Sequence, residues 1–142
     1  MKILVVIAVV LSTGLFFITP KASAHGKVSS GGTVDAQMKK LHAMMPMFSI
    51  ASAELETALE KGDSAAALVQ AEKIKAAVPD LKKSKPHKNV KQRKKFVDIA
   101  ISFDEAITST VNLIKKDDIA GAKTAFKKVE EVCATCHAKF RD

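Results

Sequence analysis

Residues 119–140 read IAGAKTAFKKVEEVCATCHAKF, and apolar side chains recur in this segment at every third or fourth position. The recurring positions are Ile119, Ala122, Phe126, Val129, Cys133, Cys136 and Phe140. This spacing is typical of one face of an α-helix. The sequence therefore predicts an amphipathic helix over residues 119–140, with both cysteines on its apolar face.

The end of this segment holds Cys133-Ala134-Thr135-Cys136-His137, and C-x-x-C-H is the pattern to which a c-type haem is attached. Two thiols three residues apart on a helix project from the same face and can bond to the two vinyl groups of a porphyrin. His137 then presents an imidazole nitrogen to the iron. The sequence predicts one covalent haem c, with Cys133 and Cys136 as thioether residues and His137 as the proximal iron ligand.

Other functions of the cysteine pair fit the sequence less well. A thioredoxin-like C-x-x-C follows a strand, and no strand pattern precedes Cys133. A zinc site needs two further ligands, and the remaining histidines, His25, His42 and His87, are not spaced as a second ligand pair. A disulfide between residues three apart on one helix would be strained.

The N-terminal segment has the pattern of a secretory signal peptide. A lysine precedes an apolar run over residues 3–18, and an A-x-A cleavage signal ends at Ala24. The run is shorter than the ~20 residues that span a bilayer, so no membrane span is expected after processing. We predict a cleaved peptide over residues 1–24, a single domain over residues 25–142, and export to the periplasm, where c-type haem is attached in bacteria.

The rest of the chain also shows helical periodicity. Three further apolar patterns run from Thr33 to Leu59, from Ala67 to Val78 and from about Asn89 to Ile114. Pro46 is expected to kink the first of these helices, and Pro79 to end the second. Two tight joints and one longer middle connection predict the all-α class, as an antiparallel up-down-up-down four-helix bundle around one covalently bound haem.

A signal peptide, four predicted helices and a terminal C-x-x-C-H followed by Phe140 and Arg141 resemble the cytochrome c-prime family, the class II four-helix-bundle cytochromes c. The resemblance implies that Phe140 and Arg141 surround the haem, with the arginine on the proximal side. It also allows a homodimer, since many relatives pair through their first two helices. Two departures stand out: Val34 occupies a position that is often basic, and no aromatic residue begins the third helix.

The residue opposite His137 depends on how the first and last helices align. If their ends lie level, Met38 faces the iron, while His42 and Met45 lie about 6 Å and about 10 Å deeper. The resemblance implies that a methionine there ligates the iron in low-spin relatives, whereas a non-ligating apolar residue leaves it five-coordinate in high-spin ones. Met38 is the candidate distal ligand, with core packing as its alternative. His42 is expected to be exposed or hydrogen-bonded.

Two functions follow from these alternatives. With His137 and Met38 on the iron, the protein is expected to carry electrons. With an open distal side, it is expected to bind nitric oxide or carbon monoxide. No residue pattern specifies a catalytic base, a nucleophile or a substrate pocket, so an enzyme is not expected.

Positive charge is concentrated in residues 82–95, KKSKPHKNVKQRKK, here called the basic segment. It holds eight of the 21 basic side chains that remain after residues 1–24 are removed. The segment is expected to be a solvated loop, including His87, or a docking surface for an acidic redox partner protein. Nucleic acid is not expected as a partner, because no aromatic residues are interleaved with these charges.

Overall fold

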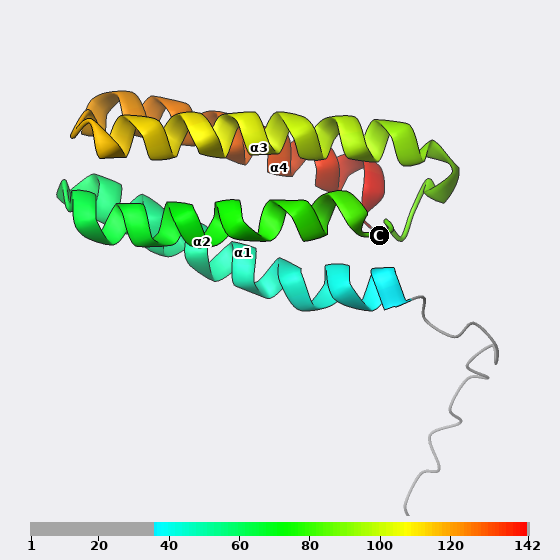
Figure 1. Ribbon diagram of the computed structural model, residues 1–142. Coiled ribbons are helices and arrows are strands. Elements are labelled where there is room, and N and C mark those ends of the chain that lie inside the picture. Colours follow the sequence, from blue (N-terminus) through cyan, green and yellow to red (C-terminus); the bar gives the residue numbers. More distant parts are fainter. Residues whose placement is uncertain (1–35, 142) are drawn as a thin grey trace, which may run out of the picture. The chain divides into compact units, whose positions relative to one another are not determined.

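The structure, a computed structural model, describes residues 36–141, and every regular element in this range is a helix (Figure 1). The elements are α1 (Ala36–Lys61), α2 (Ser64–Lys83), the short 3-10 helix η1 (Val90–Gln92), α3 (Arg93–Lys115) and α4 (Ile119–Phe140). The predicted all-α class is confirmed over this range, and α4 spans the apolar positions from which it was predicted. The predicted signal peptide over residues 1–24 lies outside the described residues.

Two tight turns of the same kind join α1 to α2 and α3 to α4. Gly62 and Asp117 adopt positive φ angles of 71° and 58°, which reverse the chain direction at little steric cost for glycine and for aspartate. Asp63 and Asp118 then cap the next helix, each accepting a backbone N–H at 2.9 Å and 2.8 Å. The Ser64 hydroxyl donates to the carboxylate of Asp117, so the two turns lie together at one end (Figure 1).

The prediction that Pro79 ends the second helix was wrong, because α2 continues to Lys83. A proline removes only its own N–H from the helix ladder. Val78 and Leu81, on either side of it, are both buried, and this packing holds the last turn in helical form. The helix ends at Ser84, whose backbone is extended and whose hydroxyl donates to the carbonyl of Asp80 at 2.8 Å. Helix α1 likewise runs through Pro46 without a break.

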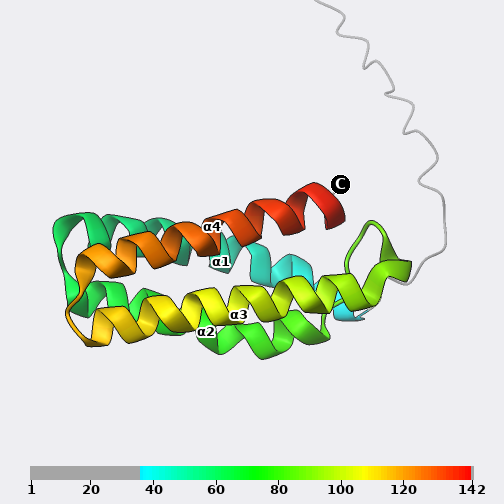
Figure 2. The ribbon, with the colours of Figure 1, turned by 90° about the horizontal axis from the view of Figure 1, so that it is seen from above.

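One hydrophobic core runs between the four helices. Its most deeply buried large side chains are Leu55 and Leu59 of α1, Ile74 and Val78 of α2, Phe96, Ile107 and Val111 of α3, and Val129 of α4. Helices that follow one another along the chain pack closely, whereas α1 and α4 contact each other much less. The connection between α2 and α3 lies at the end where α4 ends (Figures 1 and 2). The site described next lies toward this end.

Candidate functional site

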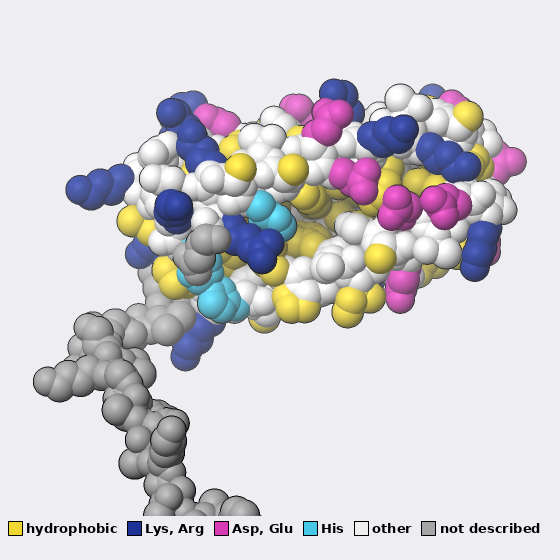
Figure 3. Space-filling view, turned by 180° about the vertical axis from the view of Figure 1, so that it is seen from behind, with side chains coloured by type: hydrophobic (Ala, Val, Ile, Leu, Met, Phe, Trp, Pro, Cys, Tyr) yellow, Lys and Arg dark blue, Asp and Glu magenta, His cyan; other side chains and the backbone are white. Residues whose placement is uncertain are grey.

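A cavity of about 620 Å³ opens between α1, α3 and α4. This volume lies within the range of pockets that hold small molecules and cofactors. Its lining is mainly apolar and includes Leu41, Phe48, Leu81, Phe96, Phe103 and Val132. In Figure 3 the same region is seen as a hollow with hydrophobic side chains inside it and histidines beside it.

Helix α4 supplies the two cysteines of the C-x-x-C-H pattern to this cavity. Cys133 and Cys136 both line it, are half-buried, and are free thiols. Burial raises the pKa of the Cys133 thiol to about 11, and the nearby Cys136 and Glu130 act in the same direction. Burial also raises the pKa of Cys136. Both groups are therefore protonated at neutral pH, which protects them from oxidation because the thiolate is the reactive form.

The last turn of α4 brings three more predicted site residues to the same lining. These are His137, Phe140 and Arg141. The Phe140 ring is buried and packs edge-to-face on Phe96, with 5.3 Å between the ring centroids. The Arg141 backbone N–H donates to the carbonyl of His137 at 3.1 Å and closes the helix end. The structure thus gathers Cys133, Cys136 and these three residues around one cavity.

Met38, the predicted distal ligand, is half-buried near the start of α1 and is not among the residues that line the cavity. His42 and Met45, one and two turns further along α1, do line it. The expectation for Met38 assumed that the ends of the first and last helices lie level. In the structure, a deeper part of α1 faces the cavity.

His87 also lines the cavity and is half-buried, so its side chain is less solvated than expected. Its ring lies 4.2 Å from that of His42 between centroids. The Nε2 atom of His42 lies 3.5 Å from Nδ1 of His87. The same Nε2 atom is also within hydrogen-bond distance of Nε2 of His87. A histidine in a connection has no periodicity, so the sequence carried no signal that paired it with His42.

The connection that carries His87 is fastened to the end of α4. The backbone N–H of Lys88 donates to the carbonyl of Phe140 at 3.3 Å, and the Asn89 side chain donates to the carbonyl of Lys139 at 2.7 Å. Asn89 adopts a left-handed conformation with φ of 55°, which asparagine tolerates better than most residues. His87 is therefore held close in space to the helical turn that contains His137.

The basic segment is only partly a loop, because it spans the end of α2, the connection, η1 and the start of α3. Some of its charges have acidic neighbours: Lys82 pairs with Asp104 at 2.5 Å, and Lys94 with Asp98 at 3.0 Å. Arg93 donates to the carbonyl of Lys82 and stacks over Phe96 at 5.5 Å. Its Nη1 atom is buried and has no hydrogen-bond partner among the described residues. A buried guanidinium donor next to a cavity-lining ring favours an anionic group nearby.

The donor set and shape of the cavity fit a haem. One wall carries two thiols and an imidazole at the required spacing, and the interior is apolar and large enough for a macrocycle. Residues 36–141 contain no group of three or more His, Cys, Asp or Glu side chains arranged to hold a metal ion. In the same range, no helix is long and apolar enough to cross a membrane.

Comparisons of this chain with protein-family models, with curated proteins and with solved structures found no match.

Proposed function

We propose that this protein is a periplasmic c-type cytochrome that carries electrons and holds one covalent haem within an up-down-up-down four-helix bundle. The observation that carries the proposal is the convergence of Cys133, Cys136 and His137 on one apolar cavity of about 620 Å³. The likeness of the terminal motif to that of the cytochrome c-prime family supports the same assignment. The exported location rests on the sequence of residues 1–24.

A haem bound here supplies an iron that changes its oxidation state by one electron. Cys133 and Cys136 would hold the group through thioether bonds, each thiol adding its sulfur to one vinyl carbon and its hydrogen to the other. His137 would offer an imidazole nitrogen to the iron. The buried rings of Phe96 and Phe140 pack against each other and would shield this part of the cavity from water.

The first test is the intact mass of the protein from a host that attaches c-type haem. The expected mass is that of the chain from His25 to Asp142 plus one haem, because both thiols reach the cavity. The measurement is mass spectrometry of the denatured protein, in which only covalent haem survives. A bare polypeptide from such a host would overturn the proposal, and a haem on an uncleaved chain would overturn only the processing site.

The basic segment supports an acidic redox partner. At neutral pH it concentrates positive charge at the end of the molecule that holds His87 and Arg141. Positive charge near the cavity attracts negatively charged reactants and raises the rate of encounter. This effect is screened beyond about 10 Å at 0.1 M salt.

A salt series tests this charge effect with two small oxidants, anionic ferricyanide and a cationic cobalt complex. Electron transfer to ferricyanide is expected to slow several-fold between about 0.01 M and 0.5 M salt, whereas transfer to the cation does not slow. Lys91→Glu with Lys95→Glu should remove most of the salt effect on the rate with ferricyanide. The matched control, Lys61→Glu with Lys116→Glu, makes the same charge change at the opposite end of the bundle. Equal effects of the two pairs would show that net charge, and not this segment, determines the rate.

A further inference from the structure

We infer that His42 of α1 is the distal ligand of the haem iron and that His87 positions it. This inference rests on the proposed function and names the residue that completes its iron site. His42 lines the cavity whereas Met38, one turn earlier, does not. Among the cavity-lining residues from α1, only His42 and Met45 carry a side chain that commonly ligates haem iron.

The contact between the two histidines supplies what an imidazole ligand needs. A neutral imidazole has one N–H donor and one nitrogen with a free lone pair. When His42 donates its N–H to His87, its second nitrogen is left as the acceptor that can bind iron. A histidine that binds a metal usually gives its other N–H to a hydrogen-bond acceptor, which fixes its ring and raises its basicity. In the structure the Nε2 atom of His42 contacts His87, which leaves Nδ1 as the nitrogen that could bind iron, and either ring nitrogen of a neutral histidine can serve as a metal ligand.

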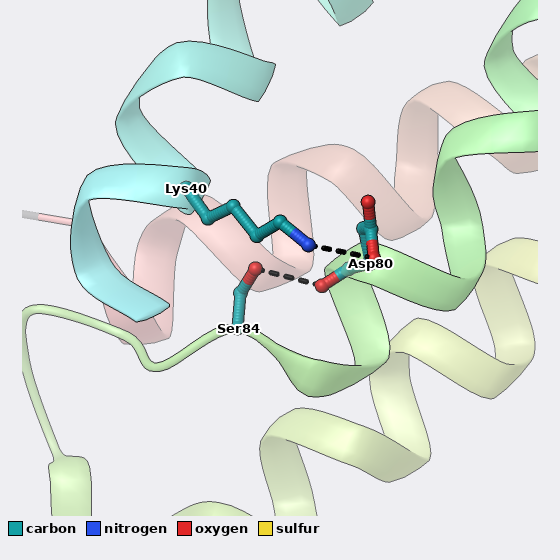
Figure 4. Close-up of polar contacts among 3 residues, drawn as sticks. All are labelled: Lys40, Asp80 and Ser84. Carbon is teal, nitrogen blue, oxygen red and sulfur yellow. Dashed lines mark hydrogen bonds and ion pairs between the residues drawn. The ribbon is translucent and has the colours of Figure 1, made fainter. Parts of the chain in front are cut away.

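Asp80 of α2 contacts a residue near each histidine of this pair. Asp80 pairs with Lys40 at 3.0 Å, and its carbonyl accepts the hydroxyl of Ser84 at 2.8 Å (Figure 4). Lys40 lies two residues before His42, and Ser84 lies three residues before His87. The start of α1 and the end of α2, which leads into the connection, therefore lie close together at Asp80.

The other side of the connection is tied to α4. Lys88, the residue after His87, donates its backbone N–H to the carbonyl of Phe140, three residues beyond His137. His87 thus lies between one attachment at Ser84, which leads to α1, and another at Lys88, which leads to the helix with the proximal histidine. A side chain whose backbone is anchored on both sides keeps its orientation before the ligand binds. Such preorganisation suits an electron carrier, whose metal site should change little in structure when the electron is transferred.

Imidazole on both sides of the iron predicts a low-spin protein with a lower reduction potential than a histidine–methionine site, since thioether ligation raises the potential. The test compares Met38→Ala and His42→Ala in the haem-loaded protein. The unmodified protein and Met38→Ala are expected to be low-spin in the ferric form. His42→Ala is expected to be high-spin, to bind carbon monoxide at least tenfold faster when reduced, and to return to low spin on addition of free imidazole.

The role of His87 is tested with His87→Leu and the conservative His87→Asn. Loss of a partner that holds a metal-bound histidine costs about 10–100-fold in metal affinity. The leucine variant is therefore expected to let added cyanide displace His42 about tenfold faster, and asparagine, which can accept the same N–H, should restore most of the loss. Equal displacement rates in the unmodified protein and the leucine variant would overturn the positioning role.

The spectrum of the unmodified protein keeps the test decisive even if a variant fails to fold. The far-red charge-transfer band of a methionine–iron bond in the ferric protein, or a change of spin state in Met38→Ala alone, would assign the ligand to methionine and overturn the inference. A high-spin unmodified protein that binds carbon monoxide readily would also overturn it, in favour of gas binding. A protein without covalent haem would instead contradict the proposed function itself.

Discussion

Replacing Cys133 and Cys136 together by serine is expected to abolish covalent haem attachment completely. Each thioether bond needs a sulfur atom, and among residues 36–141 these are the two cysteines that line the cavity. The denatured double variant should have the mass of the polypeptide alone and give no haem stain on a denaturing gel. Each single variant keeps one sulfur within reach and should retain haem through one bond, at reduced yield.

The control for this experiment lies between the two cysteines. Thr135 is exposed, and its hydroxyl donates to the carbonyl of Glu131 at 2.8 Å, an interaction that serine can also make. Thr135→Ser should therefore carry the full complement of haem. Covalent haem in the double variant would show that another residue holds the group and would contradict the proposed site.

Replacing Phe96 by alanine is expected to lower the free energy of unfolding by about 3–5 kcal/mol. The ring is only 1% exposed, packs on Phe140 and lines the cavity. Because small domains are stable by about 5–15 kcal/mol, a loss of this size is a large part of the total. Denaturant unfolding of the haem-loaded protein measures it, and the haem absorption spectrum should change in the same variant.

Two further substitutions serve as controls that distinguish an effect on the cavity from an effect on the rest of the core. Phe126 is 4% exposed and does not line the cavity, so Phe126→Ala should destabilise the protein similarly and leave the haem spectrum unchanged. Val69 is 62% exposed, and Val69→Ala should change the free energy of unfolding by less than about 0.5 kcal/mol. Identical haem spectra for Phe96→Ala and the unmodified protein would show that the haem does not contact this wall.

The features that the sequence predicted correctly are those that neighbouring residues determine. Apolar spacing located α4, because the pattern repeats with the turn of the helix. The similar joints at Gly62 and Asp117 proved to be turns of one kind, since capping and positive φ involve only a few adjacent residues. The same locality applies to Cys133 and Cys136, whose spacing alone places both thiols on one helix face.

Tertiary packing determined the features that depend on residues far apart in the chain. Helix α2 continues past Pro79 because buried neighbouring residues stabilise the next turn. The sequence shows only that the proline lacks an N–H, and it does not show this packing. The part of α1 that faces the cavity depends on how α1 and α4 align, and a shift of one turn, about 6 Å, exchanges Met38 for His42. His87 reaches His42 across 45 residues of sequence because hydrogen bonds to α4 hold its connection in place. Helical periodicity relates residues three or four apart, so it identified the helix that carries the cysteines but not the residues that the fold places beside it.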